Sequence, residues 1–122
     1  MSPRTAMQLL HGGRVVIGAA LTVAPVTAGE GWIGAAARSG GGQVALRALG
    51  VRDLMLGLGA VHAARSGDAR SAATWSLALA ACDTVDFVAT GAARAELPNR
   101  GVPVMAIAFG AAATGVALAT RL

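Results

Sequence analysis

The chain has 122 residues, of which 55% are hydrophobic and only 13% are charged, against about 25% charged in soluble domains. With a mean hydropathy of +0.62, too few polar side chains remain to cover a soluble protein of this size. The net charge of +4 does not indicate nucleic-acid binding, because the basic residues are scattered arginines rather than a cluster beside aromatic residues.

The first predicted element is a helix over residues 5–24, which ends before Pro25 because a residue preceding proline disfavours the α conformation. The same region resembles a secretory signal, since an apolar run over residues 15–24 precedes small residues at Val26–Ala28. We expect this segment to be retained and to cross the membrane. One face of this helix gathers four residues: His11, Arg14, Gly18 and Thr22.

The connector over residues 26–42 leaves two interpretations open. Its segment 31–38 begins next to Trp32, and tryptophan is typical of helices that lie along the lipid headgroups. The run Ser39–Gly42 is instead typical of an ordinary loop.

Three further helices are predicted over residues 43–64, 71–92 and 102–120, each near the roughly 20 residues needed to cross a bilayer core. Short polar turns separate them, so consecutive helices must run antiparallel. The predicted fold is all-α: a single domain over residues 1–122, built as an integral membrane bundle of four transmembrane helices.

Small and polar residues recur at three- and four-residue steps on each of these helices, which is typical of close helix packing in membranes. In helix 43–64 they are Gly50, Asp53, Gly57, Ala60 and Ala64. In helix 71–92 they are Ser76, Leu79, Asp83, Asp86 and Thr90. In helix 102–120 they are Ala106, Gly110, Ala113 and Ala117. The last helix suits contact with a second copy equally well. The lipid bilayer is therefore the expected partner, with a homo-oligomer or a larger membrane complex as a candidate.

Six charged residues fall inside the predicted spans and form the candidate site: Arg14, Arg47, Arg52, Asp53, Asp83 and Asp86. A charge at mid-bilayer costs about 2.5–3.5 kcal/mol on insertion scales, so such residues are expected to pair in the bundle interior. Counting residues outward from the turn at Gly67 gives equal depth to Arg52 and Asp83, and nearly equal depth to Arg47 and Asp86. The geometry predicts these two ion pairs.

The segment Arg47-Ala-Leu-Gly-Val-Arg-Asp-Leu-Met-Leu-Gly-Leu-Gly resembles a motif of small four-helix membrane proteins of actinobacteria, the DUF4267-like group. The resemblance extends to Trp75 followed by Asp83-Thr-Val-Asp86, and to a first helix ending in Ala24-Pro25. It implies a four-helix membrane fold and no particular activity.

Three functions stay open. A structural or accessory membrane protein, held together by an Arg/Asp network and without enzymatic activity, is favoured. A small transporter coupled to a proton or cation is the first alternative, because intramembrane aspartates bind such ions. A membrane-embedded isomerase or cyclase acting on a lipid-like substrate is the second, with Asp83 or Asp86 as acid.

No cofactor or metal is expected, because Cys82 is the only cysteine and neither histidine has an acidic residue at ligand spacing. The distribution of arginines favours a multi-pass protein of the cell membrane with both termini in the cytoplasm.

Overall fold

The structure, a computed structural model, describes all 122 residues, and it contains helices and no strand. The elements in order are α1 Pro3–Val23, α2 Pro25–Ile33, η1 Gly34–Arg38, α3 Gly40–Ser66, α4 Ala69–Ala92, η2 Arg94–Glu96, η3 Pro98–Gly101 and α5 Val102–Ala119. The prediction of an all-α chain is confirmed. The four long helices lie where they were predicted, with ends that differ by a few residues. The connector contains a fifth helix, α2, which the loop interpretation did not include.

Three segments are long and apolar enough to cross a membrane by length and composition, which supports a membrane protein. They are Pro3–Val23, Ala69–Ala92 and Pro98–Ala119. The longest helix, α3, is not among them. Its central charged residues, Arg47, Arg52 and Asp53, lower its mean hydropathy, so the fourth span stays a prediction.

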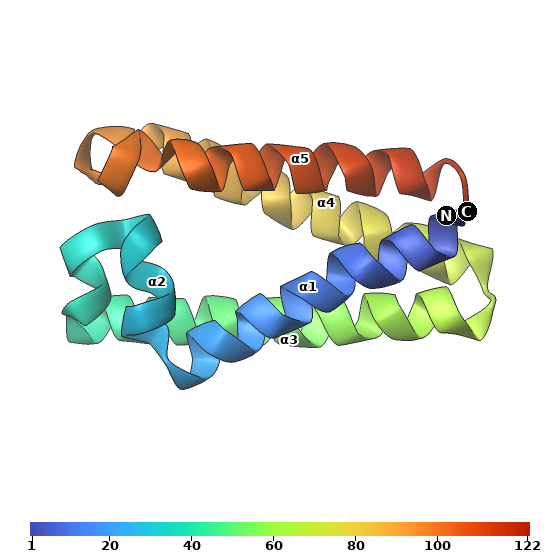
Figure 1. Cartoon of the computed structure of the whole chain (residues 1–122), viewed down its shortest axis with the longest axis horizontal. Helices are drawn as coiled ribbons and strands as arrows, with labels where there is room; N and C mark the ends of the chain where they lie inside the picture. The colour runs from blue at the N-terminus through green and yellow to red at the C-terminus, as the bar shows by residue number, and fades with distance from the viewer.

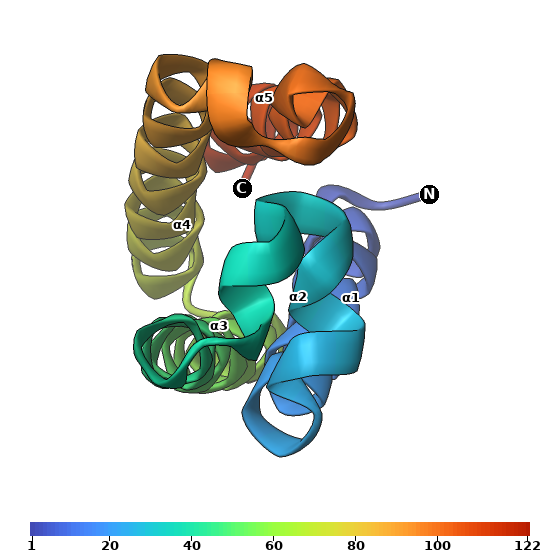
Figure 2. The same cartoon turned by 90° about the vertical axis from the view of Figure 1, so that its left-hand side faces the viewer.

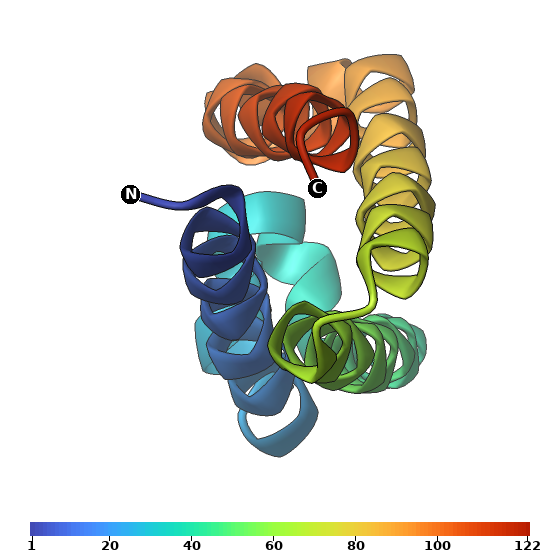
Figure 3. The same cartoon turned by 90° about the vertical axis from the view of Figure 1, so that its right-hand side faces the viewer.

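The long helices form two layers (Figure 1). In one layer α1 packs antiparallel against α3, and in the other α4 packs antiparallel against α5 (Figure 2). The layers lie closest at the end that holds both termini and the turn between α3 and α4 (Figure 1). Figure 3 views the bundle from this end. The layers diverge toward the opposite end, where α2 and η1 lie (Figure 1).

The turn between α3 and α4 is as short as the sequence predicted. Gly67 ends α3 in the left-handed conformation, with φ at 85°, which glycine adopts without steric cost. Asp68 begins α4 by accepting a hydrogen bond from the backbone N–H of Ser71 at 3.1 Å. Arg4 donates from Nη2 to the carbonyl oxygen of Gly67 at 2.8 Å. The start of α1 is therefore fixed to this turn.

Several polar and charged side chains are buried, whereas many large apolar side chains are exposed. The buried polar or charged residues are His11, Arg14, Asp53, Ser76, Asp83 and Thr90. Large apolar side chains are exposed on all four long helices, for example Leu9, Val51, Val85 and Ile107. Water does not favour this distribution, whereas hydrocarbon surroundings do.

Two apolar clusters flank the buried charges along the long axis of the bundle, one on each side. Near the termini, Met7 and Leu79 pack with Leu118 and with alanines of α3 and α4. Near α2, Leu21 packs with Ala37 and Leu46. The predicted packing faces of α1, α3 and α4 are confirmed in most positions. The seam considered for α5 does not pack within the chain, because the buried residues of this helix are Ala108, Gly115 and Leu118. On α5 nearly every residue is small or apolar, so the sequence gives no preferred direction.

The connector folds back onto α4. Trp32 in α2 is partly buried and donates from Nε1 to the hydroxyl oxygen of Thr90 at 3.1 Å. Arg38 at the end of η1 pairs with Glu30 at 3.0 Å on the exposed side. Trp32 thus bridges the diverging end of the two layers, which residue spacing alone did not predict.

Gly18 and Gly50 allow α1 and α3 to touch through their backbones. A Cβ added at Gly18 would lie 2.5 Å from the backbone nitrogen of Leu54 and 2.6 Å from the carbonyl oxygen of Gly50. These atoms belong to backbone and cannot move aside without separating the helices.

We expect Gly18→Ala to lower the free energy of unfolding in detergent by about 1–2 kcal/mol, the usual cost of overpacking a close contact. Gly13→Ala on the same helix is the matched control, because nothing lies within 4 Å of an added Cβ there. That control should be neutral or stabilising, since alanine is the better helix former. Equal effects of the two changes, measured by titrating purified protein with denaturing detergent, contradict the close contact.

Candidate functional site

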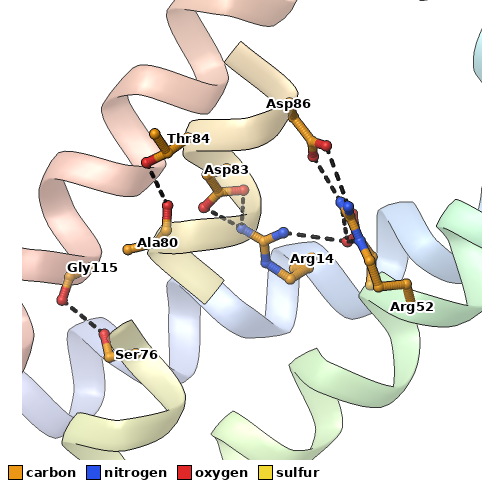
Figure 4. Close-up of polar contacts among 9 residues, drawn as sticks. Arg14, Arg52, Ser76, Ala80, Asp83, Thr84, Asp86 and Gly115 are labelled. Atoms are coloured by element: carbon orange, nitrogen blue, oxygen red, sulfur yellow. Dashed lines mark hydrogen bonds and ion pairs between the residues drawn. The ribbon is translucent and has the colours of Figure 1, made fainter. Parts of the chain in front are cut away.

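Arg14 of α1 lies at the centre of the buried charges. Its Nη2 donates to both carboxylate oxygens of Asp83 at 2.5 Å, and its Nη1 lies 3.4 Å from Oδ1 of Asp53. Only 9% of Arg14 and 5% of Asp83 are exposed. One guanidinium therefore joins α1 to both α3 and α4 (Figure 4).

Arg52 of α3 extends this arrangement. Its Nη1 and Nη2 donate to the two oxygens of Asp86 at 3.3 and 2.7 Å, a bidentate pair. Its Nε and Nη2 also donate to Oδ1 of Asp53 at 3.2 and 3.1 Å. The result is an alternating chain of charges, here named the Arg/Asp network, in the order Asp83, Arg14, Asp53, Arg52 and Asp86.

The two predicted pairs are not the pairs in the structure. Asp83 binds Arg14 rather than Arg52, and Arg52 binds Asp86. Depth along the α3–α4 hairpin was estimated without α1, which brings a third arginine to the same level. Asp83 and Asp86 lie three residues apart and so differ by about 60° in direction. One faces α1, while the other faces α3.

Arg47 does not belong to the Arg/Asp network. Its side chain is exposed and donates from Nε to the carbonyl oxygen of Thr22 at 3.3 Å. Arg47 precedes Asp53 by six residues, which turns it by about 120° away from the network face of α3. The structure therefore brings together five of the six predicted site residues.

The Arg/Asp network is not balanced in charge. It holds two guanidinium groups and three carboxylates, so its formal charge is −1 when every group is ionised. The six predicted site residues include three arginines and three aspartates. Because Arg47 lies outside the Arg/Asp network, the network has one more negative than positive charge.

His11 is buried on the same face of α1 as Arg14, as residue spacing predicted, but it was not among the six predicted site residues. It lies one helical turn before Arg14, and only 1% of it is exposed. Neither of its ring nitrogens has a partner in the protein, and the same holds for Nε of Arg14. The backbone of His11 lies against α3, since a Cβ added at Gly57 would lie 3.0 Å from the His11 carbonyl oxygen. His11 thus borders the Arg/Asp network.

A second buried polar contact joins the layer of α4 and α5. Ser76 donates from its hydroxyl to the carbonyl oxygen of Gly115 at 2.8 Å (Figure 4). The hydroxyl of Ser76 is thereby satisfied, and it lies outside the Arg/Asp network. Its role is to hold α5 against α4.

The outer side of the same layer carries an apolar groove of about 500 Å³ between α4 and α5. Phe87 and Phe109 line it with their ring centroids 6.0 Å apart. None of the charged network residues lines this groove. No group of three or more His, Cys, Asp or Glu side chains is arranged to hold a metal ion.

Comparisons with protein-family models, curated proteins and solved structures found no match to this chain. The resemblance of the Arg47–Gly59 segment to the DUF4267-like group stays a prediction.

Proposed function

We propose that the protein is a non-enzymatic, four-span protein of the cell membrane, in which the Arg/Asp network fixes one helical layer against the other. The observation that supports this proposal best is that Arg14 and Asp83 join α1 to α4 across the two layers. Buried ion pairs of this kind specify how helices fit together, even where they add little net stability.

The fourth span is α3, although its composition is less apolar than that of the other three. Arg52 and Asp53 are paired within the bundle, so their charges do not face lipid. The outward side chains of α3 are apolar and between 46% and 69% exposed: Val44, Val51, Met55 and Leu58. This outward face is the one that hydrocarbon requires.

Both termini lie on the cytoplasmic side in this proposal. The end of the bundle that holds the termini carries Arg4, Arg65, Arg70 and Arg121, and the opposite end carries Arg38, Arg94 and Arg100. Arginines near the ends of spans favour the cytoplasmic side. A contact with a second copy through the exposed small residues of α5 is compatible with this arrangement.

We expect the protein to fractionate with membranes and to resist carbonate extraction, because its outer surface is apolar on all four long helices. Topology follows from cysteine labelling in a Cys82→Ser background. Ser66→Cys and Arg70→Cys should label from the cytoplasmic side, whereas Ala36→Cys, before α3, and Ala95→Cys, after α4, should label from the other side. Recovery in the soluble fraction without detergent contradicts the proposal, and labelling of Ala36→Cys and Ser66→Cys from one side contradicts the fourth span, α3.

A second candidate function is transport coupled to a proton or a monovalent cation. It is favoured by the surplus of one carboxylate in the Arg/Asp network, because unbalanced intramembrane charges are typical of ion pathways. A substitution in the network that leaves stability unchanged and abolishes ion flux into vesicles would support this candidate over a structural role.

A further inference from the structure

The apolar groove between α4 and α5 offers an occupant hydrocarbon contacts and no free polar group. Six of its seven lining residues are hydrophobic, and two of them, Val88 and Phe109, are exposed. The seventh, Thr84, already donates its hydroxyl hydrogen to the carbonyl oxygen of Ala80 at 2.8 Å. The groove therefore suits an apolar occupant, such as the acyl chain of a lipid.

Two arginines without an acidic partner lie at one end of the same layer, in the turn between α4 and α5 (Figure 1). Arg94 and Arg100 are exposed, and neither forms an ion pair within the protein. The backbone of Leu97 holds them close together, since its N–H donates to the carbonyl oxygen of Arg94 and its carbonyl oxygen accepts from the N–H of Arg100. With Glu96 as the only acidic residue of this turn, two positive charges and one negative charge leave it net positive. The turn therefore attracts an anion.

The groove and Arg94 lie on one side of α4, at a separation that one lipid spans. Arg94 follows Phe87 by seven residues, which returns it to nearly the same direction about two turns farther along the helix. The backbone N–H of Ala93 keeps its α-helical hydrogen bond, so this direction holds to the end of α4. Counted along the axis, Val88 and Thr84 lie about 9 and 15 Å from Arg94. One leaflet of a hydrocarbon core is about 15 Å thick, so an acyl chain that starts near Arg94 ends in the groove.

We propose that the groove and the two arginines form a binding site for one anionic phospholipid. The phosphate of the headgroup pairs with Arg94 and Arg100, and one acyl chain packs against Phe87 and Phe109. A second copy of the chain fits this place less well. In the same membrane it has the same orientation, so its own positive turn would lie at the same depth and repel this one.

This site adds a ligand to the proposed function, because no residue of the Arg/Asp network lines the groove. It rests on the part of that proposal in which α4 and α5 cross the membrane. Both belong to the three segments that are long and apolar enough to do so. The site does not depend on whether α3 is a fourth span.

Native mass spectrometry of the purified, delipidated protein in detergent tests the headgroup part of the site. The protein is titrated with phosphatidylglycerol and with phosphatidylcholine that has the same acyl chains. Phosphatidylglycerol should bind about tenfold more tightly, because each arginine near an anionic lipid contributes roughly fivefold and Glu96 offsets part of this gain. Arg94→Gln/Arg100→Gln should abolish the preference. Arg65→Gln/Arg70→Gln, the matched control at the other end of the bundle, should retain it.

A second pair of variants tests the groove. Ala113→Phe places a ring in the groove and should weaken the binding of both lipids by about fivefold, the effect of keeping one or two methylene groups out of an apolar site. Ala106→Phe is the matched control, because Ala106 is exposed on the same helix and does not line the groove. Its lipid binding should equal that of the wild type. Glycerol phosphate, which has no acyl chain, should not compete with phosphatidylglycerol.

Equal binding of the two lipids by the wild type overturns the proposal, and this comparison needs no variant to fold. An equal loss of preference in the two double-arginine variants overturns it too, since any surface charge would then suffice. Unchanged binding in Ala113→Phe excludes the groove, and competition by glycerol phosphate reduces the site to a phosphate site. A dimer that forms without lipid and is lost in Ala113→Phe identifies a second copy as the occupant. Each of these results leaves membrane fractionation and topology unaffected, so the lipid site can fail while the proposed function stands.

Discussion

Replacing Arg14 with leucine is expected to lower the free energy of unfolding by about 3–5 kcal/mol, the range for removing one partner of a buried ion pair. Asp83 accepts hydrogen bonds only from Arg14, and Asp53 loses one of its two arginines. Arg52, the other positive charge of the Arg/Asp network, pairs with Asp53 and Asp86 and makes no hydrogen bond to Asp83. Titration with denaturing detergent, followed by circular dichroism, measures the loss.

The matched control for this change is Arg47→Leu. Arg47 also lies inside a predicted span, but it is exposed and makes one hydrogen bond to a backbone oxygen. Its replacement should not lower the free energy of unfolding, because no carboxylate loses a partner and leucine suits a lipid-facing position better than arginine. The double variant Arg14→Leu/Asp83→Asn should recover part of the loss, because the stranded carboxylate is also removed. Equal effects of Arg14→Leu and Arg47→Leu contradict the central place of Arg14.

Arg52→Leu is expected to destabilise the protein by about 2–3 kcal/mol, at or below the lower end of the range for buried pairs. The expected loss of stability is smaller because Arg52 lies at the edge of the Arg/Asp network, where 30% of its side chain is exposed. Asp86 loses both of its hydrogen bonds, whereas Asp53 keeps its bond from Arg14. The measurement is again the free energy of unfolding in detergent.

A double-mutant cycle identifies the partner of Arg52. Combined with Asp86→Asn, the Arg52→Leu change should show a coupling energy of about 1–2 kcal/mol, within the range for residues in direct contact. Combined with Asp83→Asn, it should show a smaller coupling, because the two residues share no hydrogen bond and interact only through the network. Stronger coupling to Asp83 than to Asp86 contradicts the observed pairing and favours the pair that depth alone suggested.

The extents of the four long helices and the identity of the buried charges were predictable from the sequence. Pro25, Gly67 and the turn before Val102 end or begin helices for local reasons of backbone conformation, which neighbouring residues determine. The polar faces of α1, α3 and α4 were also predictable, because the few polar residues of each helix recur at three- and four-residue steps and so lie on one side. Five of the six charged residues in the predicted spans accordingly meet in the structure.

The partners within the Arg/Asp network were decided only by the tertiary structure. The close approach of Gly18 to Gly50 sets how α1 lies on α3, and this approach brings Arg14 to the level of Asp53. Residue counts along one hairpin give depth but not the direction in which a side chain points. Sequence spacing therefore placed Arg52 opposite Asp83, whereas the third helix supplies the arginine that binds it.

Two further features depended on packing for the same reason. The buried face of α5 had no sequence signal, because small or apolar residues lie on every side of this helix. Its contacts with α4 orient it, among them the hydrogen bond from Ser76 to Gly115 and the packing of Phe87 against Phe109. Arg47 was indistinguishable from Arg52 by residue type. Composition and periodicity thus determined that this chain forms long helices with charges inside. The packing of three helices decided which charges pair with one another. It also left the Arg/Asp network with one more carboxylate than guanidinium groups.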